Sequence, residues 1–300
     1  MFSFTKEQQT QTIAGITLGG QPGHHPTTLF GGLFFTGEPD FALARKHIQT
    51  MYMLSEKTGN PAIPDFFIQK ERYIADILSF IEHAVPNSLP FSVDIIEPSL
   101  KITLLEQLHE RGLLPRSIYN SLHIGTTEKE QEALQQYTPQ AAILVAFNPK
   151  DKSPDGKLEV LENGAHLTSC GLLELAKQLH IDTVLVDTAA LAPGDNSGAA
   201  IAAIPVVKEE YGLPTGCAIH NVVEKSAWLK DFASQKSVVD TASNVSIPLF
   251  GGDFAIFGPI KHAHEVFPVI AWYDILVSEY AEKYFGVIPV DSHPRRKFFS

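Results

Sequence analysis

Residues 141–148 of this 300-residue chain read Ala-Ala-Ile-Leu-Val-Ala-Phe-Asn. A succession of apolar residues closed by one carboxamide is typical of a strand that is buried on both faces. Such strands occur mainly in parallel sheets, because the crossover helices cover both faces of the sheet. The run therefore predicts an α/β protein in which residues 141–148 form an inner strand.

The same alternation of apolar strand and amphipathic helix extends to both sides of this run. Further strands are predicted over Thr27–Phe35, Pro64–Ile68, Phe91–Ile96, Ser117–Leu122, Thr183–Thr188, Gly216–Asn221 and Asp253–Gly258. Helices are predicted over Asp40–Thr58, Glu71–Val85, Leu100–Leu113, Glu128–Tyr137, Ser169–Leu179, Ser197–Tyr211, Ser226–Val245 and Ala263–Phe285. The glycine-rich segment 13–23 ahead of them predicts a hairpin that covers part of the fold.

About eight strand–helix repeats in roughly 260 residues fit a (β/α)8 TIM barrel, which typically needs about 250 residues. Strict alternation implies parallel pairing with right-handed crossovers. An open, doubly wound sheet is the alternative, but Gly31-Gly32 does not fit a dinucleotide-binding turn and the chain has no P-loop. We therefore predict a single barrel domain over residues 1–300.

The composition excludes several classes of function. The formal net charge is -11, whereas a nucleic-acid-binding protein or one that binds an anionic membrane surface needs a basic face. No apolar run approaches the roughly 20 residues of a membrane span, and the first residues do not read as a signal peptide. We therefore expect a cytoplasmic protein that is not inserted in a membrane. Cys170 and Cys217 are not in a CxxC arrangement and predict buried, unreactive thiols.

Five predicted strands carry an acid or an amide at or near their C-terminal ends, and in a barrel these ends carry the chemistry. These residues are Asp94, Asn120, Asn148, Asp187 and Asn221. They belong to consecutive repeats, so we expect them to converge on one mouth. The set contains no Lys, Arg or Cys, which argues against a Schiff-base aldolase and against a phosphate site. It also lacks a metal-ligand spacing, and we predict no tightly bound metal.

We expect His220 and Cys217, which precede Asn221, to have packing roles. On a strand, alternate side chains point to opposite faces, so His220 should point away from the side that Asn221 faces. Cys217, inside the same apolar run, is expected to pack in the core.

Acids and amides together suit a planar ligand with an amino-pyrimidinone edge. A carboxylate accepts hydrogen bonds from a ring N–H and an exocyclic amine, and an amide meets the adjacent oxygen and nitrogen. Pterins have that edge. A sugar would be satisfied by the same residue types, so the residues alone leave both ligands open.

The chain resembles the family that includes the H subunit of tetrahydromethanopterin S-methyltransferase, and within it the bacterial branch of glycine betaine type systems. The matching segments cover nearly the whole chain and are Gly19–Gly23, Lys57–Pro61, Ile118–Ser121, Leu144–Asn148, Leu185–Thr188 and Gly252–Ile260. The sequence departs from the H subunit at His24, where an acidic residue is expected. The wider group of methyltetrahydrofolate:corrinoid methyltransferases is more faintly similar.

The resemblance implies a (β/α)8 barrel, usually a homodimer, that binds a pterin in its mouth. By position, Asp94, Asn120 and Asp187 correspond to ligands of the pterin ring, and Asn148 to an amide near the ring. Asn221 corresponds to the catalytic amide beside N5, the nitrogen that carries the methyl group. The implied reaction moves a methyl group between methylcobalamin and N5 of tetrahydrofolate.

The corrinoid is expected to be supplied by a partner protein, because the chain has no DxHxxG-type motif of the kind that corrinoid carriers use. Three alternatives remain open. The protein could be a non-catalytic or tetrahydromethanopterin-specific pterin-binding subunit of a larger methyltransferase complex. It could be a dihydropteroate synthase, although no strand end supplies the Lys and Arg pair of that enzyme. It could also be a sugar hydrolase with Asp94 and Asp187 as paired acids.

Overall fold

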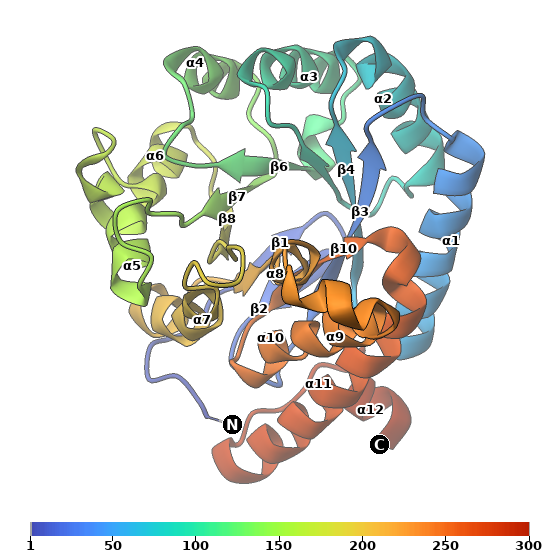
Figure 1. Ribbon diagram of the computed structural model, residues 1–300, viewed down its shortest axis with the longest axis vertical. Helices are drawn as coiled ribbons and strands as arrows, with labels where there is room; N and C mark the ends of the chain where they lie inside the picture. Colours follow the sequence, from blue (N-terminus) through green and yellow to red (C-terminus); the bar gives the residue numbers. More distant parts are fainter. Residues whose placement is uncertain (1, 300) are drawn as a thin grey trace.

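Parallel strands close into an eight-stranded barrel with helices around it (Figure 1). The computed structural model describes residues 2–299. Neighbouring strands follow the order β10-β3-β4-β5-β6-β7-β8-β9, as expected for consecutive right-handed repeats. The predicted (β/α)8 fold is confirmed. The barrel strands are β3 (Thr28–Phe35), β4 (Ala62–Ile68), β5 (Phe91–Asp94), β6 (Ser117–Leu122), β7 (Ala141–Val145), β8 (Thr183–Asp187), β9 (Thr215–Cys217) and β10 (Phe254–Pro259).

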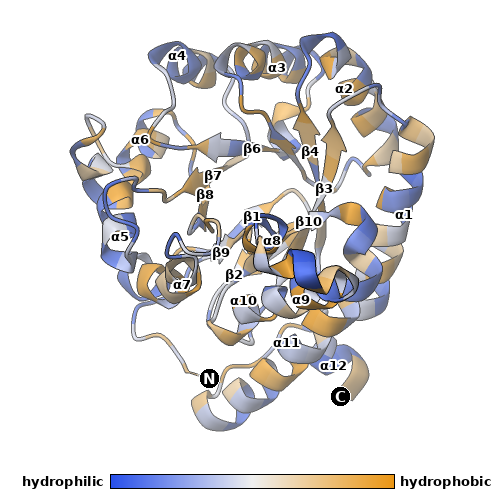
Figure 2. Ribbon diagram, in the orientation of Figure 1, coloured by the Kyte–Doolittle hydropathy of each residue, from blue (hydrophilic) through white to orange (hydrophobic). Residues whose placement is uncertain are grey.

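The outer layer consists of α-helices joined by short 3-10 turns, two of which, η4 (Trp228–Gln235) and η5 (Ile260–His262), lie near the site. The helices are α1 (Phe41–Thr58), α2 (Ile74–Ala84), α3 (Pro98–Glu110), α4 (Glu128–Gln136), α5 (Pro154–Asn163), α6 (Leu172–Gln178), α7 (Gly198–Tyr211), α8 (His220–Glu224), α9 (Lys236–Asn244), α10 (Ser246–Leu249), α11 (Ala263–Phe285) and α12 (Pro294–Phe299). Figure 2 contrasts the hydrophobic strands β3 and β4 with a largely hydrophilic outer helix such as α4. Within residues 2–299, no helix combines the length and the hydropathy that crossing a bilayer requires.

The N-terminal hairpin closes one end of the barrel. Strands β1 (Thr10–Ile13) and β2 (Ile16–Gly19) pair antiparallel, and Ile13 and Leu18 are fully buried against apolar side chains that point into the barrel. Burial of a side chain of this size contributes roughly 1.5–3 kcal/mol. The predicted covering hairpin is thus present, and the barrel opens at the C-terminal ends of its strands.

Several segments differ from the sequence-based expectation; among them, strand β7 ends at Val145, so Asn148 lies beyond the end of its strand. Strand β9 ends at Cys217, and residues 220–224 form helix α8, so Asn221 lies on a helix and not at the end of a strand. Helix α5 was not predicted, because its Pro154-Asp155-Gly156 start reads as a turn; Ser153 caps it by accepting a hydrogen bond from the Gly156 N–H. The predicted helix over 226–245 divides into η4 and α9.

A buried ion pair joins the hairpin, an outer helix and two barrel strands. Lys208 of α7 donates from Nζ to Asp253 Oδ1 at 2.6 Å and to the Gly20 carbonyl at 3.0 Å. The other oxygen of Asp253, just before β10, accepts the Thr215 N–H of β9 at 2.8 Å. Both charged side chains are almost completely buried, so each depends on the other for compensation.

Candidate functional site

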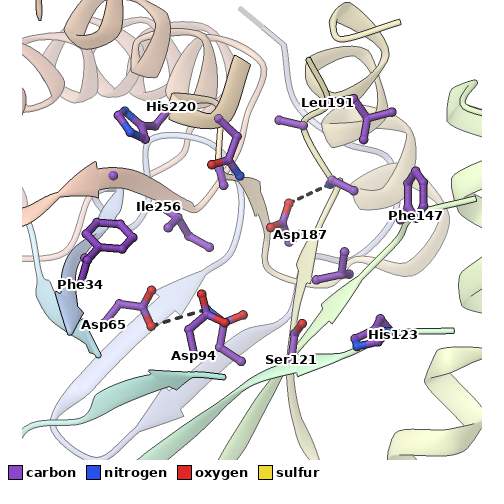
Figure 3. A pocket seen from close by; sticks show the side chains of 18 of the residues that line it. Phe34, Asp65, Asp94, Ser121, His123, Phe147, Asp187, Leu191, His220 and Ile256 are labelled. Carbon is purple, nitrogen blue, oxygen red and sulfur yellow. Dashed lines mark hydrogen bonds between the residues drawn. The ribbon is translucent and has the colours of Figure 1, made fainter. Parts of the chain in front are cut away.

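A cavity of about 400 Å³ lies at the open end of the barrel. That volume falls in the range usual for small-molecule sites. Its apolar lining includes Phe34, Val145, Phe147, Leu191 and Ile256. Its polar lining consists of Asp65, Asp94, Asn120, Ser121, His123, Asp187, His220 and Asn221 (Figure 3). No Lys or Arg is part of this lining among the residues that the structure describes.

Neighbouring strands bring two carboxyl groups and one amide together on one wall. Asp65, Asp94 and Asn120 come from β4, β5 and β6, and Asn120 Nδ2 donates to Asp65 Oδ1 at 3.5 Å. Burial raises the pKa of Asp65. Burial together with the charge of Asp65 raises the pKa of Asp94 to about 8. At neutral pH, these two carboxyl groups therefore retain a proton, and the wall presents a hydrogen-bond donor beside several acceptors.

Asp187 supplies a further carboxyl group from the end of β8. Its Oδ1 accepts the Ala189 N–H at 2.7 Å, which fixes its orientation. Burial raises the pKa of Asp187 to about 6, and the nearby Lys157 of α5 opposes that shift. Lys157 is itself buried and donates from Nζ to the Ala189 carbonyl at 3.4 Å. At pH 7 Asp187 is mostly ionised, so it can accept hydrogen bonds from a ligand.

Asn221 and His220 reach the same cavity from the first turn of α8. Asn221 is exposed to solvent, and its N–H donates to the Ala218 carbonyl at 3.0 Å. The expectation that His220 faces away from the side of Asn221 is wrong, since both residues line the cavity. Successive residues on a helix are only about 100° apart, so neighbours can share a face. Gly258 makes room for His220: a Cβ at Gly258 would lie 2.3 Å from the imidazole Cγ.

Asn148 lies outside this lining. It is buried, its Nδ2 donates to the Gly156 carbonyl at 3.1 Å, and its Oδ1 accepts the backbone N–H groups of Lys150 and Asp151 at 2.9 and 3.1 Å. The side chain thus organises the loop between β7 and α5. Asp94, Asn120, Asp187 and Asn221 do meet at one mouth, so four of the five predicted residues share the cavity, and the structure does not bring Asn148 to it.

Several residues of the site or its surroundings were not identified from the sequence, among them His123, which lines the cavity. Asp65 is a lone carboxylate inside the apolar strand β4, and that placement was a usable signal. His220 was assigned a packing role, and Lys157 lies on the helix that was not predicted. Cys217 matches its expected role: it is fully buried, and burial raises its thiol pKa, which keeps it unreactive.

The raised pKa values predict a stability that falls as the pH rises. Between about pH 4 and pH 8, the folded protein holds a proton on Asp94 that the unfolded chain has lost, so deprotonation favours unfolding. We expect the free energy of unfolding to decline by about 2–3 kcal/mol between pH 6 and pH 9, because each pH unit below the folded pKa costs about 1.4 kcal/mol. In Asp94→Asn the decline should be smaller, because the repulsion between Asp65 and Asp94 is gone. Urea titrations at several pH values measure the free energy of unfolding. If it declines with pH equally steeply in the wild type and in Asp94→Asn, Asp65 and Asp94 do not hold a proton together.

Sequence comparison places this chain in a known family. The family described as "Tetrahydromethanopterin S-methyltransferase MtrH subunit" matches residues 6–290. The H subunit of tetrahydromethanopterin S-methyltransferase from Methanothermobacter thermautotrophicus is 37% identical over 308 residues, with 98% of each chain covered. The H subunit of the putative methyltransferase mtx from Methanosarcina barkeri is 34% identical, also with 98% of each chain covered.

Solved structures agree on the fold. A Yersinia pestis DHPS structure with a pterine-sulfa conjugate superposes with a TM-score of 0.59 at 14% identity, covering 88% of this chain and 98% of the other. The dihydropteroate synthase of Xanthomonas albilineans in complex with 7,8-dihydropteroate superposes with a TM-score of 0.55 at 12% identity. The superposition covers 84% of this chain and 93% of the other. At these identities the likeness concerns the barrel alone. The sequence matches decide the family: this chain belongs to the MtrH family of tetrahydromethanopterin S-methyltransferase subunits.

Proposed function

We propose that this protein transfers a methyl group between a methylated corrinoid protein and N5 of tetrahydrofolate. The observation that carries the proposal is the meeting of Asp94, Asn120, Asp187 and Asn221 at one cavity in a member of a methyltransferase family. The relative from Methanothermobacter thermautotrophicus is named for tetrahydromethanopterin. Tetrahydrofolate is preferred here to tetrahydromethanopterin because of the resemblance to the bacterial branch.

The lining suits the amino-pyrimidinone edge of a pterin. Ionised Asp187 accepts hydrogen bonds from a ring N–H and an exocyclic amine. The wall of Asp65, Asp94 and Asn120 offers both donors and acceptors to the neighbouring ring atoms. Phe34, Ile256 and Phe147 supply apolar surface for the flat ring. We place the reacting nitrogen next to Asn221, at the open side of the cavity, where a partner protein has access.

In the proposed reaction, N5 attacks the methyl carbon of methylcobalamin. A C–N bond forms, the Co–C bond breaks, and cobalt keeps the electron pair as Co(I). The N–H proton of N5 must leave in the same overall reaction. The corrinoid arrives on a partner protein, as the absence of a DxHxxG-type motif indicates. We also propose a cytoplasmic homodimer, on the basis of the composition and the wider family resemblance.

The direct test mixes the purified protein with free methylcobalamin and tetrahydrofolate. We expect a protein-dependent loss of the methylcobalamin absorption spectrum together with formation of N5-methyltetrahydrofolate, measured by mass spectrometry. The matched reaction uses tetrahydromethanopterin. Methyl transfer to tetrahydromethanopterin but not to tetrahydrofolate would overturn the choice of tetrahydrofolate.

The second candidate is a non-catalytic pterin-binding subunit, which the word "subunit" in the names of the relatives favours. Binding of either pterin by calorimetry, without methyl transfer from free methylcobalamin or from a corrinoid protein, would establish it. A dihydropteroate synthase is not favoured, because the lining of the cavity in the described chain has no cation for a pyrophosphate group.

A further inference from the structure

A second cavity of about 640 Å³ adjoins the mouth of the barrel. It lies beside α8, α9 and η5, and it shares Phe34, His220 and Asn221 with the first cavity. Asp240 of α9 and His262 of η5 are part of its lining. His220 therefore connects the proposed pterin site with a second polar space that the proposed reaction does not use.

One buried carboxylate at this junction bonds the imidazole of His220 and lies close to that of His262. His220 Nδ1 lies 2.8 Å from Asp240 Oδ2, and His262 Nδ1 lies 3.4 Å from the same oxygen. Asp240 is only 3% exposed, and its Oδ1 is buried without a hydrogen-bond partner in the part of the chain that the structure describes. A buried carboxylate with spare acceptor capacity stabilises a positive charge on a neighbouring imidazole.

The hydrogen bond to Asp240 fixes the tautomer of His220. A carboxylate can only accept, so Nδ1 of His220 carries the proton that the bond uses. Nε2 is then the free acceptor of the neutral ring. Gly258 and Asp240 hold the ring at the rim of the cavity, next to Asn221. An imidazole held by a carboxylate behind it is a common arrangement for proton transfer.

We propose that His220, oriented by Asp240, carries the proton that N5 of the pterin loses or gains during methyl transfer. This inference rests on the proposed function. When N5 receives the methyl group, Nε2 of His220 accepts the N5 proton and becomes imidazolium. Asp240 stabilises that charge until Nε2 releases the proton to solvent. In the reverse direction, imidazolium returns the proton to N5, so the methylated nitrogen can leave as a neutral amine.

The charged groups that line the two cavities around His220 carry both signs. Those that face it are Glu224 on α8, Lys236 and Asp240 on α9, Lys261 and His262 on η5, and Asp187 across the first cavity. Glu224 and Lys236 pair with each other at 2.7 Å. That hydrogen bond, followed by the nearby Lys236, His220 and His262, lowers the pKa of Glu224, which stays ionised. Glu224 is therefore paired with a lysine, whereas Asp240 bonds directly to the imidazole of His220.

The test measures single-turnover methyl transfer from free methylcobalamin to saturating tetrahydrofolate between pH 5.5 and 8.5. The variants are His220→Gln and Asp240→Asn, and the control is His264→Gln, an exposed histidine on the first turn of α11. Gln at 220 can still donate to Asp240, so the fold is retained. We expect His220→Gln to be about 100-fold slower at pH 7, with the rise of the rate with pH abolished and pterin affinity within twofold of wild type.

Asp240→Asn should be about tenfold slower, with the rise in rate displaced to lower pH, because the imidazolium loses its compensating charge. Added imidazole should restore part of the rate to His220→Ala. An unchanged pH profile and rate in His220→Gln would overturn the inference while leaving the proposed methyl transfer intact. Absence of transfer by the wild-type protein with free and protein-bound corrinoid would instead remove the proposed function, on which the inference rests.

Discussion

Replacing Asn221 with alanine is expected to slow methyl transfer by about 100- to 1,000-fold while pterin affinity stays nearly unchanged. The reason is that charge develops at N5 only as the methyl group moves. A hydrogen bond that strengthens with that charge lowers the barrier without tightening ground-state binding. Asn221 is exposed on the first turn of α8 and lines the cavity, so its truncation leaves the buried core untouched.

Single-turnover absorbance changes with methylcobalamin give the rate, and calorimetry gives the dissociation constant of tetrahydrofolate. Asn87→Ala is the matched control, since Asn87 is an exposed amide before β5, at the opposite end of the barrel. Unchanged turnover in Asn221→Ala would remove the residue from the reaction. A weakened affinity with an unchanged rate at saturation would make it an ordinary ligand of the ring.

The fold could be derived from the sequence because apolar periodicity reports burial on both faces of each strand. Residues 141–145 and 183–187 show this most clearly, and the structure places them as β7 and β8. The end of β9 could not be derived in this way. Residues 217–219 are all apolar and buried, and such a short run suits a strand or the start of a helix equally well.

The sequence located the site residues that lie at or near the ends of strands, but it did not identify His220 on helix α8 or Asp65 within strand β4. Asp94 and Asp187 end their strands, and Asn120 lies near the end of its strand, so the barrel rule located all three. His220 was missed because the alternation of a strand was applied to residues that form a helix. Asp65 was missed because it lies within β4, where its register pairs it with Ser92 of β5. Its significance comes from the approach of Asp94, a relation between strands that one sequence does not contain.

The largest effect on stability is expected at the buried pair of Lys208 and Asp253. Lys208→Met should lower the free energy of unfolding by about 3–5 kcal/mol at pH 7.5, because it leaves the Asp253 carboxylate buried without its cation. Burial already raises the pKa of Asp253, and Lys208 opposes that shift. Without Lys208 the carboxylate takes up a proton at higher pH, so the loss of stability should be smaller at pH 5 than at pH 7.5.

Urea unfolding at both pH values measures the effect. Lys236→Met is the control, because it breaks the exposed pair with Glu224 at 2.7 Å and should cost at most about 1 kcal/mol. The double variant Lys208→Met/Asp253→Asn should recover part of the loss, since a neutral amide can still accept the Thr215 N–H that Asp253 now accepts at 2.8 Å. If Lys208→Met is as stable as the wild type, water must reach Asp253 and solvate its charge in place of the lysine. A loss of stability in the double variant equal to that in the single variant would assign the effect to the packing of the lysine side chain, whose Nζ lies over the Phe4 ring, 5.4 Å from its centroid.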